Sequence, residues 1–361
     1  MVHDDRNIEH IKALGEQAMK KLFIWNLLML TVFSLVFISC QKAEAMKSDS
    51  HKMYKIVIIT PLSHPSLDQA IDGFIKGLNE KGFDKGKINF EVMNANGDFA
   101  KIPSLTKSAI LKQPNLIFVL TTPAASTAIK ITNKANIPLV YTAVTDPVAA
   151  GIVTSMDKSE TLATGVSDRY PVKKQIKLFL SILPGMKSCG ILYNPSEENS
   201  RILVRQTIEA MSEYNINCVK YEIKNASEIP AQTQKILASH DCVIVNGDNL
   251  ATENLSIIIN LCIKNKKPLF VGDPNSVRNG AVATVGPNYY SLGLKSGLKA
   301  AQILNGESPK SIPSEYPTEF DYIINTKAAK DMGIKIPASF WESREIWESL
   351  GKTNTDPAHP R

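Results

Sequence analysis

Residues 139–147 read Leu-Val-Tyr-Thr-Ala-Val-Thr-Asp-Pro, an apolar run that ends at a polar residue followed by proline. Four other runs share this form, at residues 56–61, 117–123, 191–195 and 269–274. Continuous apolar runs of this length are typical of strands buried on both faces, as in a parallel sheet. Thr, Asp or Asn before Pro is typical of a helix N-cap followed by the first helical residue. The runs therefore predict a series of strand–helix units in an α/β protein.

These units fall into two successive groups with the same order of elements, at residues 54–163 and 186–285. Each group predicts a doubly wound parallel sheet, and ligands of such sheets bind where the strands end. In the second group the pattern predicts one helix over Ala251–Lys264. Crossovers between the two lobes are expected near Gly165, Val285 and Ser314. The predicted organisation is a first lobe of residues 54–165 and 285–313, a second lobe of residues 166–284 and 314–340, and a C-terminal tail of residues 341–361.

The N-terminal residues have the features of an export signal. An apolar stretch at residues 22–39 follows Lys20-Lys21 and ends at Ser39-Cys40, as in a signal peptide with a basic start. Met19 suits the start of such a signal, so residues 1–39 are interpreted as a signal peptide with an over-extended start. The following polar residues, 40–53, suit a flexible tether.

Cys40, at the end of the apolar stretch, resembles the lipobox cysteine of bacterial lipoproteins, which is lipidated after cleavage. We therefore expect a lipid-anchored protein of the cell envelope, periplasmic or extracytoplasmic. The alternative is an uncleaved signal anchor, since eighteen largely apolar residues are just long enough to span a bilayer.

Composition excludes several classes of protein. The net charge of +6 in 361 residues is mild and spread along the chain, so no nucleic acid is expected as a partner. Only two histidines, His64 and His240, lie within the predicted lobes, so neither a metal site nor a cofactor is expected. A location in the cell envelope would permit disulfides among the remaining cysteines. They show no CxxC or metal-binding spacing, however, and we interpret them first as buried free thiols; they are Cys189, Cys218, Cys242 and Cys262.

Several long motifs, in order along the chain, carry a resemblance to a known family. They include residues 64–68 (His-Pro-Ser-Leu-Asp), 94–98 (Asn-Ala-Asn-Gly-Asp), 141–147, 193–200 and 288–290. Over residues 54–337 the chain resembles type I periplasmic-binding-protein-fold lipoproteins of ABC transporters, in particular their tryptophan-binding-like subfamily. One departure is Asn246-Gly247, where that family more often has Pro-Thr.

The resemblance implies an extracytoplasmic solute-binding protein that delivers a small ligand to an ABC permease and ATPase complex. It implies a monomer that binds an amino acid, aromatic or branched, in a cleft between the lobes. Two alternatives stay open: a ligand sensor that serves a membrane receptor, and an exported α/β enzyme. The enzyme is disfavoured because the chain has neither a Gly-x-Ser-x-Gly nor a His-Glu-x-x-His motif.

An amino-acid carboxylate is held well by unpaired N–H groups at a helix N-terminus. Residues 122–126, Thr-Pro-Ala-Ala-Ser, offer such a terminus, with the Thr122 hydroxyl and the backbone at Ala124 as candidate donors; Thr122 would otherwise only cap its own helix. A second terminus, at residues 194–200, adds the candidates Asn194, Ser196 and Asn199, whereas Glu197 fits a structural capping box.

The ligand ammonium requires an acceptor, ideally an ionised one. Asp248 is the first choice because it follows a buried strand, and Asp168, at a crossover, is the second. Asp146 and Asp273 precede proline and are interpreted first as N-caps. The remaining candidates for the cleft are Ser63, His64 and Thr145.

Overall fold

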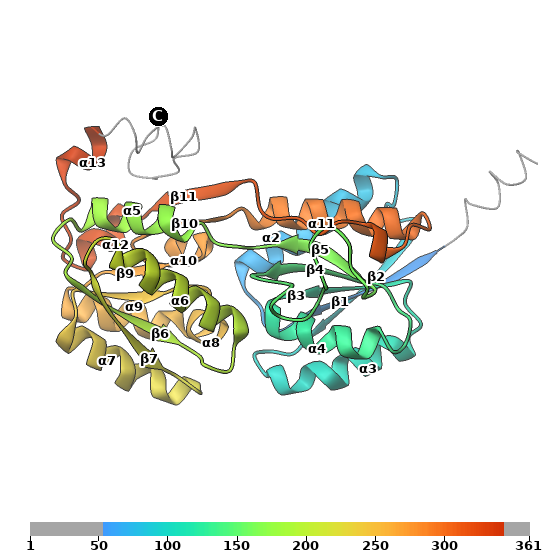
Figure 1. Cartoon of the computed structure of the whole chain (residues 1–361), viewed down its shortest axis with the longest axis horizontal. Coiled ribbons are helices and arrows are strands. Elements are labelled where there is room, and N and C mark those ends of the chain that lie inside the picture. Colours follow the sequence, from blue (N-terminus) through green and yellow to red (C-terminus); the bar gives the residue numbers. More distant parts are fainter. Residues whose placement is uncertain (1–52, 343–361) are drawn as a thin grey trace, which may run out of the picture. The chain divides into compact units, whose positions relative to one another are not determined.

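The computed structural model describes residues 53–342, which contain two sheets covered by helices (Figure 1). The first sheet has five parallel strands in the order β2-β1-β3-β4-β5. Its strands are β1 Tyr54–Thr60, β2 Ile88–Asn94, β3 Leu116–Leu120, β4 Leu139–Val144 and β5 Ala163–Ser167.

Both faces of this first sheet are buried, as its continuous apolar runs predict. Along β1, Ile56 and Ile58 point into the layer formed with two of the helices, while Val57 and Ile59 point into the opposite layer. The first layer contains α2 Pro65–Glu80 and α11 Tyr289–Leu304, and the second contains α3 Ile102–Leu111 and α4 Thr122–Thr132. We call this sheet with its four helices the first lobe.

The second sheet has six strands in the order β11-β10-β9-β8-β6-β7. All neighbours are parallel except β10 and β11, which are antiparallel. The predicted fold class, two doubly wound α/β lobes, is therefore confirmed, with one antiparallel edge strand added. The strands are β6 Ser188–Tyr193, β7 Asn217–Glu222, β8 Cys242–Val245, β9 Leu269–Val271, β10 Ala283–Pro287 and β11 Phe320–Ile324.

This second sheet and the helices that cover it form the second lobe. Helix α5 was not predicted, although its apolar face is buried in the core of this lobe. The helix predicted over residues 251–264 is divided at Asn254 into α8 and α9. The helices are α5 Val172–Ile182, α6 Glu198–Ser212, α7 Ile229–Ser239, α8 Asn249–Glu253, α9 Leu255–Asn265, α10 Pro274–Arg278 and α12 Thr326–Asp331, and α13 Ala338–Glu342 follows.

Not every polar residue before proline is a helix N-cap. Asp273 caps α10 as predicted, through the backbone N–H of Ser276 at 2.7 Å. Asp146 caps only a turn, by accepting from Ala149 N–H. Helix α2 begins at Pro65, with His64 as its cap, and not directly after Thr60-Pro61. The strand ends were therefore predicted more accurately than the helix starts.

Three crossover segments join the lobes, and the last of them is hydrogen-bonded to β5, the strand that leads into the first. The backbone of Glu315, in the last crossover, accepts from Ser167 N–H at 2.8 Å and donates to the carbonyl of Gly165 at 3.0 Å. The buried Lys299 ammonium also bonds the Glu315 carboxylate at 2.6 Å. The boundaries predicted at residues 165 and 285 fall inside β5 and β10.

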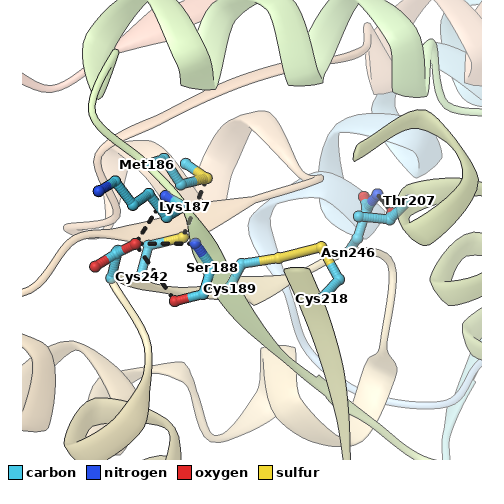
Figure 2. The surroundings of a disulfide bond; sticks show 9 residues. Met186, Lys187, Ser188, Cys189, Thr207, Cys218, Cys242 and Asn246 are labelled. Atoms are coloured by element: carbon cyan, nitrogen blue, oxygen red, sulfur yellow. Dashed lines mark hydrogen bonds between the residues drawn. A yellow bond between two sulfur atoms is a disulfide. The ribbon is translucent and has the colours of Figure 1, made fainter. Parts of the chain in front are cut away.

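The interpretation of all four lobe cysteines as free thiols was wrong for two of them. Cys189 on β6 and Cys218 on β7 form a disulfide, with their Cα atoms 4.8 Å apart (Figure 2). The two residues are direct partners in the parallel register of these strands, which places their side chains on one face of the sheet. Cys242 and Cys262 are buried free thiols. The bond fastens β7, the edge strand of the second sheet, to β6, its one neighbouring strand within residues 53–342.

Helices α2 and α11 approach unusually closely because glycines line their contact. Two pairs at i,i+4 spacing, Gly73 with Gly77 and Gly293 with Gly297, face the opposite helix. A Cβ atom at Gly293 would lie 1.9 Å from the carbonyl oxygen of Ala70, and one at Gly77 would lie 2.2 Å from the carbonyl oxygen of Leu294. The backbones therefore occupy the space that any larger side chain would need.

No helix among residues 53–342 is long and apolar enough to cross a membrane. The predicted signal peptide, the Cys40 lipidation site and most of the tether lie outside these residues.

Candidate ligand-binding site

Residues of both lobes line one pocket at the carboxyl ends of the parallel strands. Seven of the twelve residues predicted for the ligand site belong to its lining: His64, Thr122, Thr145, Asp168, Asn199, Asp248 and Asp273. They follow β1, β3, β4, β5, β6, β8 and β9. This is the edge at which open α/β sheets bind ligands.

The other five predicted residues lie outside the pocket lining. Ser63 is exposed and accepts from the Asn94 amide, and Ser196 is exposed near the start of α6. Ala124 is fully buried within α4. The remaining two are Asp146, in the turn after β4, and Asn194, whose side chain accepts from Ser196 N–H.

Several lining residues were not predicted, because they are not marked in the sequence by a polar residue followed by proline. Leu62, Leu67 and Ala143 add an apolar wall. Tyr170 and Tyr289 add two aromatic rings: Tyr170 lies in the crossover between β5 and α5, and Tyr289 is the first residue of α11, just after the crossover from β10. Their place at a crossover would have been the sequence signal for them, since such a residue lies beside both lobes.

Asp168, between β5 and α5, is a buried acid of the pocket whose side-chain partners are both hydroxyl groups. It is 5% exposed, and its carboxylate accepts from the hydroxyls of Thr145 at 3.1 Å and Tyr289 at 3.2 Å. Tyr289 in turn contacts the Tyr170 hydroxyl at 3.1 Å. Burial raises the pKa of Asp168 to about 6, although these two hydrogen bonds partly oppose the shift, and the nearby Asp273 charge adds to it. A neighbouring cation would stabilise the ionised form.

Asp248 has its carboxylate occupied by the protein. One oxygen accepts from Ala251 N–H at 2.8 Å and so caps α8. The other accepts from the backbone N–H of Asn194 and from the Ser200 hydroxyl. Burial first, and then the charge of Glu197, raise the pKa of Asp248 above its ordinary value. Three donors from its own lobe leave this side chain little capacity to bind a ligand.

Glu197 also serves a structural role, as predicted, although it does not cap its own helix. Its carboxylate accepts from the backbone N–H groups of Asn249 at 3.1 Å and Leu250 at 3.2 Å. Together with Asp248, it satisfies the first N–H groups of α8. The start of α8 is therefore unavailable to an anionic ligand.

The start of α4 is different, because no side chain in the described part of the protein caps it. Thr121 precedes the helix with φ of +75°, a strained conformation for a residue other than glycine. The Thr122 hydroxyl accepts from Thr145 N–H at 3.2 Å and retains its own proton for donation. Unpaired backbone N–H groups at a helix start attract carboxylates, so this end of the pocket is suited to bind an anion.

Two buried polar atoms in the lining have no hydrogen-bond partner among the described residues. They are the Thr121 hydroxyl and the amide oxygen of Asn199. The Asn199 amide nitrogen is used, since it donates to the Gly247 carbonyl and to Glu197. Buried polar atoms are normally satisfied, so these two are suited to bind a polar ligand.

The ionisable side chains of the lining are mainly acidic. Within the described part of the chain it contains three aspartates and one histidine but neither lysine nor arginine. With an apolar wall, an uncapped helix start and excess carboxylate, the pocket suits a small molecule that carries an ammonium, a carboxylate and an apolar side chain.

Comparisons with known proteins agree with this chemistry. Residues 55–343 match the family model described as ABC transporter substrate binding protein. A tyrosine-binding protein of Clostridioides difficile is 34% identical over 293 residues, which are 81% of this chain and 84% of that protein. An uncharacterised protein of Rickettsia prowazekii is 27% identical over 281 residues, which are 76% of this chain and 84% of that protein.

Two solved structures differ in how closely their shape agrees with this one. An ABC domain from Streptococcus pneumoniae in complex with L-Trp has a TM-score of 0.77 at 28% identity, over 81% of this chain and 98% of that one. A ligand-free, open substrate-binding protein with adhesive properties from Clostridium difficile has a TM-score of 0.61 at 33% identity, over 79% of this chain and 97% of that one. The shape is thus more similar to the ligand-bound relative, although the sequence is more similar to the open one.

Proposed function

Because this chain belongs to the ABC transporter substrate-binding protein family, we propose that its ligand is an aromatic L-amino acid. Members of this family are extracytoplasmic solute-binding proteins, not enzymes, and work with an ABC permease and ATPase. The predicted solute-binding function is confirmed at this level. Related proteins are described as tyrosine-binding and as bound to L-Trp, which supports the aromatic class.

The acidic lining of the pocket carries this proposal. Asp168 replaces Asp248 as the first choice for the ammonium, because its two partners are hydroxyl groups that leave lone pairs free. The amide oxygen of Asn199 is a second acceptor. The start of α4 with Thr122 holds the carboxylate. The rings of Tyr170 and Tyr289 contact the ligand side chain.

The test is calorimetric titration of the purified protein with L-Tyr, L-Trp and L-Phe, after mass spectrometry of any ligand released on denaturation. Tyramine lacks the carboxylate and 3-(4-hydroxyphenyl)propionate lacks the ammonium, so each reports on one end of the site. We expect both analogues to bind more weakly than L-Tyr. An absence of binding by all three amino acids would overturn the proposal.

Ligand affinity should depend on pH through Asp168. Its carboxyl, with a pKa of about 6, must be ionised to bind an ammonium, and the ligand charge favours that form. At about pH 5 only about one carboxyl in eleven is ionised, so affinity should be about tenfold weaker than near pH 7.5. Titrations across this range measure the effect.

His64 also lies in the lining, and its protonated form would repel the ligand ammonium. Asp168→Asn separates the two contributions, since it removes only the carboxyl. A variant that kept the full tenfold dependence would show that another group controls binding.

We propose that the two lobes close on the ligand about their crossovers, since a ligand between lobes needs opening to enter and leave. The moving parts in this proposal are the two lobes defined above, one built on the sheet of β1 to β5 and the other on the sheet of β6 to β11. Solution scattering should show a smaller radius of gyration with ligand than without it.

The protein is further proposed to act as a lipid-anchored monomer, with Cys40 as the modified residue. The sequence motif, Lys20-Lys21, an apolar stretch and Ser39-Cys40, supports this. Cys40→Ser should therefore release the protein from the membrane fraction or block processing of its signal. Fractionation and gel mobility identical to those of the wild type would contradict lipidation.

A further inference from the structure

Beside the pocket, helix α2 of the first lobe and helix α10 of the second are joined by side-chain hydrogen bonds. The Asn275 amide of α10 donates to the Ser66 hydroxyl at 2.8 Å and to the Gln69 side-chain oxygen at 3.0 Å, both on α2. The Ser66 hydroxyl donates in turn to the Asp273 carboxylate. The paired residues lie more than 200 positions apart in the sequence, so only the arrangement of the lobes brings them together.

These groups are largely buried. Ser66 is 2% exposed, Asn275 is 4% and Asp273 is 6%. The one proton of Ser66 is given to Asp273 while its oxygen accepts from Asn275, so the hydroxyl serves as both donor and acceptor. A set of buried, mutually satisfied hydrogen bonds favours the arrangement in which it forms.

Part of this set lies outside the ligand site. Ser66 and Asp273 line the pocket, but Gln69 and Asn275 are not part of its lining. Asn275 is also held within its own lobe, since its side-chain oxygen accepts from Arg278 at 2.8 Å. The amide is thus fixed in position to meet α2.

We propose that Gln69, Ser66, Asp273 and Asn275 form an interlobe latch that sets ligand affinity by stabilising the closed arrangement. Gln69 and Asn275 act without touching the ligand. The inference rests on the proposed function, since affinity for an aromatic amino acid is one of its readouts. The apparent dissociation constant rises in proportion as the binding-competent fraction falls.

Gln69→Ala is the cleanest test, because it removes one latch acceptor from a helix that tolerates alanine. One net hydrogen bond changes an equilibrium by about two- to tenfold. Gln69→Ala should therefore raise the dissociation constant by about that factor, mainly through faster dissociation. Asn275→Ala also removes the bond to Ser66, so it should raise the constant by at least as much. The factor should be the same for L-Tyr and L-Trp. Since Gln69→Ala and Asn275→Ala both remove the bond between these two side chains, the double variant should resemble Asn275→Ala alone.

Gln302→Ala is the matched control. Gln302 is an exposed glutamine on α11 whose amide bonds only Glu307 of the same lobe. It should leave the dissociation constant and the radius of gyration unchanged. Titrations and solution scattering of the ligand-free proteins give both readouts.

The outcomes separate the two proposals. If Gln69→Ala and Asn275→Ala bind like the wild type and Gln302→Ala, the latch is wrong while the proposed function stands. If the wild type binds no aromatic amino acid, the proposed function is wrong and scattering alone decides on the latch. A ligand-free radius larger in the latch variants than in Gln302→Ala then supports it, and equal radii contradict it.

Discussion

Asp168→Ala should weaken the binding of an aromatic amino acid by at least about thirtyfold. Removing one partner of a buried, hydrogen-bonded charge pair costs ~2–5 kcal/mol, and each ~1.4 kcal/mol changes the affinity tenfold. Asp168 is the buried acid that retains acceptor capacity. Calorimetric titration with L-Tyr or L-Trp measures the loss.

The Asp168 carboxylate, which favours ligand binding, should lower the stability of the ligand-free protein near neutral pH. The folded-state pKa of Asp168, about 6, lies above its ordinary value of 3.8. The favourable contribution of this carboxyl is therefore fully present below about pH 4 and is lost as pH rises through about 6. Near pH 7.5 we expect Asp168→Asn to melt at a higher temperature than the wild type, and the gain should disappear below about pH 4.

Asp248→Ala provides the contrast, because its carboxylate satisfies Asn194, Ser200 and Ala251 of its own lobe. Leaving buried donors unsatisfied costs ~1–3 kcal/mol each. Asp248→Ala should therefore lower the apo melting temperature. The roles assigned here would be reversed if Asp248→Ala lost affinity at unchanged stability while Asp168→Ala bound normally.

The second large effect is expected at the contact between α2 and α11. Gly293→Ala should lower the free energy of unfolding by about 3 kcal/mol, the upper end of typical overpacking costs. The new methyl group would meet the backbone of Ala70, which cannot rotate away as a side chain can. Helix propensity alone predicts the opposite sign, a gain of about 1 kcal/mol. Chemical denaturation distinguishes the two.

Gly185→Ala is the control for this substitution, since a Cβ at Gly185 would meet nothing within 4 Å. It should leave the free energy of unfolding nearly unchanged. Because Tyr289, at the start of α11, lines the pocket, Gly293→Ala should also weaken ligand binding. A variant as stable as the wild type would show that the helices can separate at little cost.

The strands could be predicted from sequence because burial on both faces leaves a continuous apolar run, as at residues 56–59 and 117–120. The helix starts were less predictable. A side chain that caps a helix looks the same in sequence as one that caps a turn, as Asp273 and Asp146 do.

The sequence predicted that the candidate site lies where the strands end. It did not predict which of the aspartates there is best placed to bind the ligand ammonium. Asp168 and Asp248 both follow buried strands, and only their partners distinguish them. Those partners come from distant segments: Tyr289 for Asp168, and Asn194 with Ser200 for Asp248. The disulfide was missed for the same reason, because the register of β6 against β7 decides which cysteines meet.

The Cys189–Cys218 bond links the maturation of this protein to its place in the cell. Thiols stay reduced in the cytosol, whereas exported proteins form disulfides. A chain that folded before export would lack the cross-link, which is typically worth ~2–4 kcal/mol. Its edge strand β7, largely exposed and paired on one side only, would be held by backbone hydrogen bonds and packing alone. Export and oxidation therefore complete the second lobe, so the chain becomes most stable only in the compartment where it works.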